Sequence, residues 1–305
     1  MRLLRINSDG NFSLTRFLPG EIPPYTILSH TWETDNQELT FQDMVNRAGR
    51  NKAGYRKIQF CRDQAKKDDL QYFWVDSCCI DKASSAELSE AINSMFRWYQ
   101  DAVKCYVYLS DLSTSDVISL VSSRLPGGSP LSRSKWFTRG WTLQELLAPS
   151  SVEFFSKEGD WLGDKGTLEL HISDITGIAV KALQGTPMSH FSLDERISWA
   201  TDRQTTIEED QAYCLLGIFE VHIPLIYGEG RKNAFRRLQE VAKFTSKPKP
   251  FSTVPFAPDP GFVNRPEFLA WIHDKCAGPG ARAALVGLGG VGFVNVRFFN
   301  ITVLT

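Results

Sequence analysis

The chain has 305 residues, of which 42% are hydrophobic, 23% charged and 12% aromatic. This composition provides enough apolar side chains for a hydrophobic core and excludes disordered and collagen-like proteins. Because 34 basic residues nearly balance 35 acidic ones, the net charge of -1 argues against a nucleic-acid partner and against a polybasic membrane-surface protein.

Sequence features also indicate the compartment. No apolar run reaches the roughly 18 residues that a membrane span needs, and the N-terminus lacks the apolar stretch of a signal peptide. Six cysteines are too few for a disulfide scaffold in a chain of this length, and no Cys-x-x-Cys motif occurs. We therefore expect a reduced, cytoplasmic protein without a membrane span.

The first 245 residues alternate between β-type apolar runs and amphipathic helical patterns. Strands are predicted at 25–28, 72–75, 105–109 and 152–155, with helices around 58–65, 84–99 and 142–147. Ser84 and Glu87 have the spacing of a capping box at the start of the second helix. A Ser-, Gly- and Pro-rich stretch at 113–134 predicts a long surface loop. This alternation predicts an α/β fold, with a parallel sheet flanked by helices.

From about His190 onward the pattern becomes helical. Helices are predicted at 195–200, at about 206–219 and around 234–241, the second after another capping-box candidate, Thr206 and Glu209. We expect these additional C-terminal helices to pack onto the sheet layer. Five prolines then fall within 248–260 and predict a stiff linker. The expected organisation is a first domain over 1–245, a Pro-rich linker over 246–262 and a further segment over 263–305.

Polar and aromatic side chains gather where three of the predicted strands end. They include Ser29, His30 and Trp32 after the first strand, Asp76 and Asp81 after the second, and the stretch 136–145 beyond the third. In an open parallel sheet, ligands bind in the crevice outside the carboxyl ends of the strands. We therefore expect a binding crevice there. The alternative is that these positions are ordinary polar loop residues.

Trp141 and Glu145 are four residues apart on a predicted helix. At helical spacing they share the face opposite a stripe formed by Leu143, Leu146 and Leu147. A solvated face rarely carries a tryptophan beside a lone carboxylate, so the pair is a candidate functional feature. The alternative is a partly buried tryptophan beside an ordinary exposed glutamate.

A glycine-rich segment follows a predicted strand near the end of the chain and contains Gly287, Gly289, Gly290 and Gly292. It has the glycines of a P-loop, whose backbone amides cradle phosphates. The Lys and Ser/Thr that should follow are replaced by Phe293 and Val294. We therefore expect a degenerate P-loop without nucleotide hydrolysis.

Two other chemistries find little support in the sequence. Cys78 or Cys79 could act as a nucleophile with His30 as base, but nothing in the sequence brings them together. Buried cysteines are usually inert packing residues. The five His and six Cys show no metal-ligand spacing, so we expect neither a metal nor a cofactor.

Six segments carry a recognisable pattern: LSHTW at 28–32, WVDSCCIDK at 74–82, ELSEAINSM at 87–95, RGWTLQEL at 139–146, DQAYCLLGIF at 210–219 and YGEG at 227–230. In this order they resemble the fungal heterokaryon incompatibility (HET) domain over roughly residues 1–245. The resemblance implies a role in non-self recognition, in which incompatible fungal cells fuse and die. Residues 262–292 resemble the start of the nucleotide-binding domain of fungal NLR-like (STAND) proteins, which implies that 263–305 is a truncated P-loop NTPase domain.

HET domains are also similar to TIR domains, which implies a TIR-like (flavodoxin-like) sheet. By this resemblance, 27–29, 74–76 and 107–110 correspond to the first three TIR strands. Trp141 and Glu145 match the Trp-x-x-x-Glu helix whose glutamate is catalytic in TIR enzymes that cleave NAD. The insertion at 113–134 departs from a compact TIR domain.

The resemblance therefore implies NAD as the substrate and Glu145 as the catalytic residue. A fixed carboxylate could stabilise the oxocarbenium charge that develops on the ribose as the nicotinamide leaves. The residues expected to bind the substrate or shape its pocket are Ser29, His30, Trp32, Asp76, Asp81 and Trp141. For Asp76 and Asp81, hydrogen bonding within their own loop is an equally plain alternative.

Two further readings remain open at this stage. The chain could be a non-enzymatic signalling module that acts through oligomerisation and partner recruitment, or a fragment without activity. For the NAD-cleaving effector and for the signalling module we expect a homo-oligomer in the active state, with an incompatibility or NLR-type protein as partner.

Overall fold

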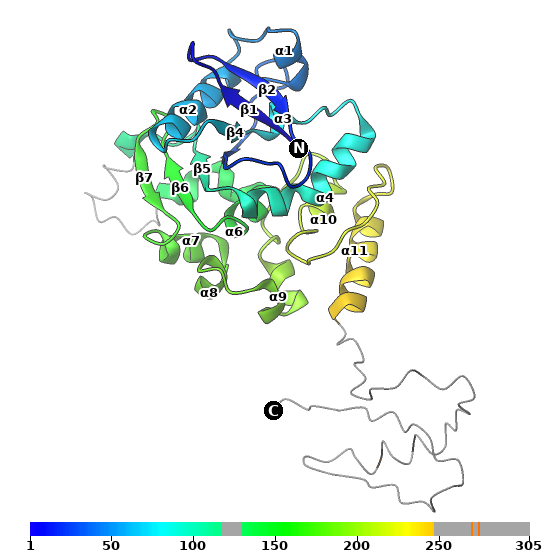
Figure 1. Ribbon diagram of the computed structural model, residues 1–305. Helices are drawn as coiled ribbons and strands as arrows, with labels where there is room; N and C mark the ends of the chain where they lie inside the picture. Colours follow the sequence, from blue (N-terminus) through cyan, green and yellow to red (C-terminus); the bar gives the residue numbers. More distant parts are fainter. Residues whose placement is uncertain (117–129, 247–269, 271–273, 275–305) are drawn as a thin grey trace, which may run out of the picture. The chain divides into compact units, whose positions relative to one another are not determined.

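The computed structural model describes residues 1–116 and 130–246, together with Ala270 and Asp274 (Figure 1). The chain divides into two compact units, Met1–Ser246 and Lys247–Thr305. The glycine-rich segment from Gly287 to Gly292 and the predicted linker over 247–262 lie outside the described residues. Within the described helices, none is both long and apolar enough to cross a bilayer.

A mixed sheet of seven strands forms the centre of the described first unit, in the order β2-β1-β4-β3-β5-β6-β7. Its strands are β1 (Arg2–Ile6), β2 (Phe12–Arg16), β3 (Thr26–His30), β4 (Tyr72–Trp74), β5 (Lys104–Tyr108), β6 (Val152–Phe155) and β7 (Trp161–Asp164). The four central strands, β4, β3, β5 and β6, run parallel to one another. In chain order they are arranged 2-1-3-4, as in the flavodoxin-like type of sheet.

The central strands were predictable because both of their faces are buried. All five residues of β3 are buried, and so are four of the five residues of β5. Parallel strands covered by helices on both sides consist of nearly continuous apolar runs. The four predicted strands are confirmed, although β3 extends to His30. The antiparallel strands at the margins, β1, β2 and β7, were not predicted.

Helices surround the sheet and continue to Ser246. They are α1 (Phe41–Val45), α2 (Gly54–Lys67), α3 (Asp76–Cys79), α4 (Ser85–Asp101), α6 (Thr142–Leu147), α7 (Glu169–Thr176), α8 (Val180–Leu183), α9 (Leu193–Ser198), α10 (Asp210–Tyr213) and α11 (Arg231–Ser246). Short 3-10 helices add η1 (Pro130–Arg133), η2 (Lys135–Thr138) and η3 (Met188–His190). Buried side chains of α10 and α11 belong to the same hydrophobic cluster as those of the strands, so these late helices share the core of the first unit.

The helices α2 and α6 cover opposite faces of β3, as adjacent residues of this strand show. Ser29 donates a hydrogen bond to Glu145 of α6. The next residue, His30, pairs with Glu38, which is held in turn by Lys57 of α2. Successive side chains of a strand point to opposite faces. In Figure 1, α2 accordingly lies above the strands and α6 below them.

The predicted capping box at α4 is half formed. Ser84 caps the helix by accepting a hydrogen bond from the backbone N–H of Glu87. The carboxylate of Glu87 does not return to Ser84; it accepts from the backbone N–H of Asp81 and pairs with Arg2. The helix start is therefore tied to β1 and to the loop after α3.

The second predicted capping box, at Thr206, is wrong. The helix α10 begins after Glu209, whose Oε1 accepts hydrogen bonds from the backbone N–H groups of Gly228 (2.8 Å) and Gly230 (2.9 Å). This carboxylate joins α10 to the loop that leads into α11. It forms no capping box with Thr206.

Gly217 allows α4 to approach the segment after α10. A Cβ at this position would lie 2.1 Å from Cβ and 2.3 Å from Cγ of Phe96. We expect Gly217→Ala to lower the free energy of unfolding by about 1–3 kcal/mol, because the core cannot take up the extra carbon without shifting. Denaturation by urea measures the change. Gly166→Ala is the matched control, since its Cβ would meet only Oδ1 of Asp164 at 3.2 Å; equal losses in both variants would contradict the packing argument.

Candidate functional site

The carboxyl ends of β3 and β4 bring several predicted site residues together. Ser29 and His30 are the last residues of β3, and Trp32 follows two residues later. Asp76 begins α3, just beyond the end of β4. Because β3 and β4 are parallel neighbours, their ends lie at the same edge of the sheet. The predicted meeting of these strand ends is therefore present in the fold.

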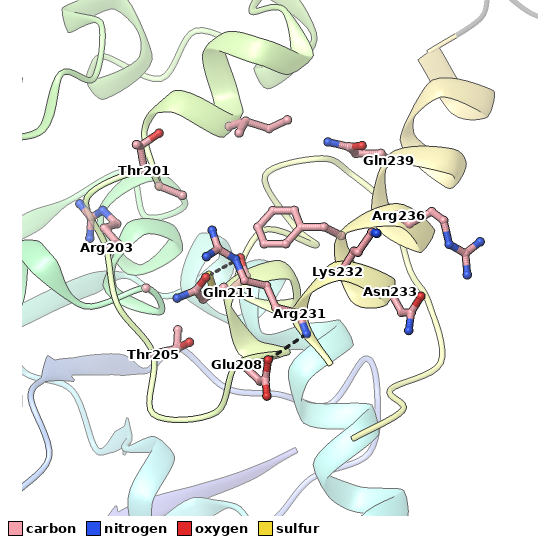
Figure 2. Close-up of a pocket in the computed structure, with 15 residues that line it drawn as sticks. Thr201, Arg203, Thr205, Glu208, Gln211, Arg231, Lys232, Asn233, Arg236 and Gln239 are labelled. Carbon is pink, nitrogen blue, oxygen red and sulfur yellow. Dashed lines mark hydrogen bonds between the residues drawn. The ribbon is translucent and has the colours of Figure 1, made fainter. Parts of the chain in front are cut away.

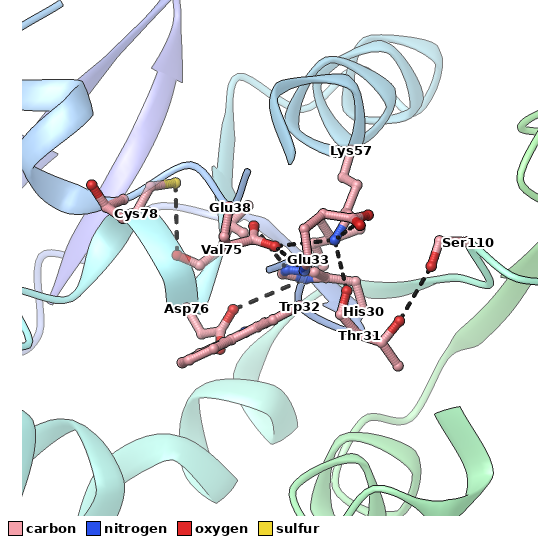
Figure 3. Close-up of polar contacts among 12 residues, drawn as sticks. His30, Thr31, Trp32, Glu33, Glu38, Lys57, Val75, Asp76, Cys78 and Ser110 are labelled. Carbon is pink, nitrogen blue, oxygen red and sulfur yellow. Dashed lines mark hydrogen bonds and ion pairs between the residues drawn. The ribbon is translucent and has the colours of Figure 1, made fainter. Parts of the chain in front are cut away.

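A group of polar side chains at this edge, which we call the edge cluster, consists of His30, Trp32, Glu38, Lys57 and Asp76 (Figure 3). His30 is central: its Nε2 lies 3.5 Å from Glu38 Oε1 and its Nδ1 lies 4.0 Å from Asp76 Oδ1. The indole N–H of Trp32 donates to Asp76 Oδ2 at 2.9 Å. Lys57 Nζ lies 3.1 Å from Glu38 Oε2. The imidazole thus lies between two carboxylates.

The electrostatics of the edge cluster keep Glu38 ionised. Burial alone would raise the pKa of its carboxyl group, but the neighbouring imidazole of His30 and the ammonium of Lys57 outweigh burial and hold the pKa well below its usual value. Lys57 also donates to the backbone carbonyl of Thr31 at 2.6 Å, directly after β3. The buried ammonium of Lys57 therefore bridges Glu38 and the backbone at Thr31, and it fixes the loop that follows β3.

Trp32 is the exposed part of the edge cluster, with 47% of its surface accessible. The ammonium of Lys82 lies 3.3 Å from the centre of its ring, a cation–π contact. Burial lowers the pKa of Lys82, while the charges of Asp76 and Glu38 act in the opposite direction. The indole therefore presents an aromatic surface to solvent, held in place by Asp76 on its edge and Lys82 on its face.

Asp81 serves its own loop. Its Oδ1 accepts a hydrogen bond from the backbone N–H of Ala83 at 3.1 Å, and its own backbone N–H donates to Glu87. This corresponds to the loop-capping alternative that the sequence left open. Asp76, by contrast, contacts Trp32 and His30 and belongs to the edge cluster.

Glu145 lies on the other face of β3, in a second polar group. Ser29 donates to Glu145 Oε2, and the indole N–H of Trp136 donates to Ser29 Oγ at 2.8 Å. Only 6% of Glu145 is exposed. Burial, and next the charge of Asp76, raise its pKa to about 8, although hydrogen bonds from Ser29 and Tyr99 lower it. The carboxyl group is therefore mostly protonated at neutral pH.

The alternative of an ordinary exposed glutamate beside Trp141 is wrong, because Glu145 is buried. Every residue of α6 is buried, including Gln144 and Glu145, so the helix has no solvated side. Trp141 is half-buried, and its indole N–H donates to Asp210 of α10 at 3.1 Å, whereas Glu145 contacts Ser29. Glu145 is thus covered by β3, whereas Trp141 contacts α10, a helix far along the chain that local periodicity could not reveal.

Neither cysteine beside the edge cluster has the environment of a nucleophile. Cys78 and Cys79 are buried, and a hydrogen bond with Cys79, burial and nearby carboxylates raise the pKa of Cys78 well above its usual value. A reactive thiol needs the opposite shift. Among the described residues, no group of three or more His, Cys, Asp and Glu side chains is placed to hold a metal ion.

Sequence reasoning missed the residues that organise both polar groups. Glu38 and Lys57 had no motif, since Glu38 lies in a loop and Lys57 occupies one polar position in an amphipathic helix. Trp136 fell within the stretch 136–145 that was singled out, but its role as donor to Ser29 was not foreseen. The sequence does carry one signal for Lys57. At helical spacing this lysine lies on the same face of α2 as Gly54, Ile58 and Cys61, which are buried.

The raised pKa of Glu145 predicts a pH-dependent stability. Between its ordinary value of 4.5 and about 8, the folded state keeps a proton that the unfolded chain releases. Stability should therefore fall as pH rises through this window. We expect Glu145→Gln to remove about 1 kcal/mol or more of that loss. Urea denaturation at pH 5 and pH 8 measures it, with Glu90→Gln on the exposed surface as control; identical pH slopes in Glu145→Gln and the unmodified chain would refute the assignment.

The segment of the chain that holds the edge cluster matches a known protein family. Residues 25–126 match the family described as "Heterokaryon incompatibility protein (HET)". Over 246 residues the chain is 54% identical to "Vegetative incompatibility protein HET-E-1" of Podospora anserina, a match that covers 79% of this chain and 18% of that protein. No solved structure matches the chain. All five edge-cluster residues lie within 25–126, whereas Glu145 lies outside. This part of the chain is therefore similar to heterokaryon incompatibility (HET) domains.

Proposed function

We propose that this chain acts as an effector of fungal heterokaryon (vegetative) incompatibility and of the cell death that accompanies it. The observation that carries this proposal is the 54% identity over 246 residues to a protein named for vegetative incompatibility. The chain spans only 18% of that relative's length, so the shared activity is assigned to the HET region. In the active state the chain would form a homo-oligomer and would respond to an incompatibility or NLR-type partner.

We further propose that its chemistry is the hydrolysis of NAD to nicotinamide and ADP-ribose. The support is the parallel core in the order 2-1-3-4, with polar side chains at the carboxyl ends of β3 and β4, where such sheets bind ligands. In this reaction the ribose C1′–nitrogen bond breaks, its electron pair stays on the nicotinamide nitrogen, and water adds to C1′ with release of a proton. The pyridinium nitrogen carries its positive charge before the bond breaks and nicotinamide leaves as a neutral molecule, so no acid is needed to protonate it.

The proposed roles divide between the two faces of β3. The exposed ring of Trp32 offers a surface on which a base or nicotinamide ring could stack. Glu145, once ionised and released from Ser29, would stabilise the positive charge on the ribose. The described state, with Glu145 buried and hydrogen-bonded to Ser29, is then a resting state. Oligomerisation is the proposed event that opens this hydrogen bond to the substrate.

The test is nicotinamide release from NAD by the purified chain, both free in solution and clustered through a fused oligomeric tag. We expect turnover when clustered, and a loss of about a hundredfold in Glu145→Gln, as for removal of one electrostatic stabiliser. The rate should rise between pH 6 and pH 8.5, because only the ionised carboxylate is competent and burial raises the pKa of Glu145 to about 8. Glu90→Gln serves as the matched control. Turnover by Glu145→Gln at the rate of the unmodified chain would exclude the catalytic role.

A non-enzymatic signalling module is the second candidate function. The burial of Glu145 on an α6 without a solvated side favours it, since the carboxyl group has no direct access to solvent. Expression of the full chain and of Glu145→Gln in a fungal host separates the two. Equal cell death from both, together with absence of NAD cleavage by the clustered protein, would support the signalling module.

A further inference from the structure

The exposed indole of Trp32 already carries a positive charge on one face. The ammonium of Lys82 lies 3.3 Å from the centre of the ring. At this distance the ammonium rests directly on the ring, in the space that a stacked planar group would fill. A ligand ring can therefore stack on this face only after Lys82 has moved away.

The indole keeps its orientation without help from Lys82. Its N–H donates to Asp76 Oδ2 at 2.9 Å, and Asp76 Oδ1 lies 4.0 Å from His30 Nδ1 within the edge cluster (Figure 3). The carboxylate at the edge of the ring adds its negative charge to the attraction that an indole face exerts on cations. Trp32 and Asp76 together therefore form a fixed surface that favours positive charge.

Lys82 is held at this surface by little else. It occupies an exposed position after α3, and within the described chain its ammonium forms no hydrogen bond or salt bridge. Cation–π contacts at exposed sites are weak, and the lysine side chain is a flexible four-carbon stem. A ligand that makes a larger contact with the indole would therefore displace the ammonium.

The shape of the surface favours a planar cation. Quaternary ammonium groups are recognised by cages of several aromatic rings. Among the described aromatic side chains none packs against the ring of Trp32, which leaves 47% of this residue exposed. A planar aromatic cation covers a single indole with its whole face and supplies the charge that the ammonium of Lys82 now supplies. A pyridinium ring has both properties.

We propose that the ammonium of Lys82 occupies the subsite of a pyridinium ring on Trp32 and competes with that ring for it. The inference rests on the proposed function, because NAD carries its positive charge on the nicotinamide ring before cleavage. It adds a determinant of specificity: Trp32 and Asp76 select the charged, oxidised form of the dinucleotide. In the resting state Lys82 limits access to their surface, and on binding the pyridinium ring replaces the ammonium.

The experiment uses the full chain, isotopically labelled, and follows the NMR signal of the Trp32 indole N–H, which is assigned by its loss in Trp32→Phe. The probes are methylnicotinamidium, which is nicotinamide methylated on its ring nitrogen and permanently charged, and neutral nicotinamide. We expect methylnicotinamidium to shift the signal and to bind about fivefold more tightly than nicotinamide. Equal affinity for the two compounds would overturn the proposal, and so would the absence of a shift with either at millimolar concentration.

Tetramethylammonium tests the shape argument with the same signal. It carries the same charge as methylnicotinamidium but is not planar, so we expect it to bind more weakly. Tighter binding of tetramethylammonium would overturn the assignment of the surface to a pyridinium ring.

Variants of the lysine test the competition. Lys82→Gln should bind methylnicotinamidium about fivefold more tightly, because removal of the ammonium leaves the ring face open. Lys82→Arg restores a cation that stacks on aromatic rings and should remove this gain. Lys181→Gln removes an exposed lysine of α8 and is the matched control. Unchanged or weaker binding in Lys82→Gln would refute the competition.

A cavity of about 840 Å³ beside α11 is another place where a small molecule could bind (Figure 2). Its lining includes Arg231, Lys232 and Arg236 and no residue of the edge cluster. These positive charges disfavour a cationic probe, so Arg236→Gln should leave the affinity for methylnicotinamidium unchanged. Loss of binding in this variant would place the probe in the cavity and overturn the proposal.

Kinetics of the clustered chain separate this inference from the proposed hydrolysis. Lys82→Gln should lower the KM for NAD about fivefold, because the substrate no longer competes with the ammonium. An unchanged KM would exclude the competing role of Lys82. A chain that binds methylnicotinamidium as expected but releases no nicotinamide from NAD would exclude the hydrolysis and leave the pyridinium subsite standing.

Discussion

The hydrogen bond between Ser29 and Glu145 is the contact on which the arrangement of this domain depends. It joins the central strand β3 to α6, a helix with no solvated side, and the indole of Trp136 completes it by donating to the same hydroxyl. A carboxyl group held in the core has to be neutral or fully hydrogen-bonded, and here burial keeps it mostly protonated. The position of α6 against the sheet is thereby specified by a polar contact as well as by its leucines.

Buried carboxyl groups are stabilised differently on the two faces of β3. On the α2 face, Glu38 stays ionised because His30 and the ammonium of Lys57 lie beside its carboxylate and hold its pKa low. On the α6 face, Glu145 accepts a hydrogen bond from the neutral hydroxyl of Ser29, and burial together with the charge of Asp76 keeps it mostly protonated. Adjacent residues of one strand, Ser29 and His30, therefore belong to two environments with opposite protonation behaviour.

Much of this architecture could be predicted from the sequence, for reasons that also define the limits. Buried parallel strands such as β3 are continuous apolar runs, and their polar ends meet at one edge, which made Ser29, His30, Trp32 and Asp76 recognisable. Glu38 could not be predicted, because a loop residue acquires its partners only through long-range folding. The partner of Trp141 could not be predicted for a related reason: Asp210 lies 69 residues later in the chain.

The carboxylate of Glu209 has a mechanical consequence. One of its oxygens accepts hydrogen bonds from the backbone N–H groups of Gly228 and Gly230. The neighbouring Asp210 accepts a hydrogen bond from the indole of Trp141 at the start of α6. A pulling force on the chain beyond Ser246 would therefore be transmitted along α11 and through the hydrogen bonds of Glu209 towards α6, the helix that contains Glu145. The attachment of α11 therefore combines this hydrogen-bonded carboxylate with the burial of Ala234 and Leu238 in the core.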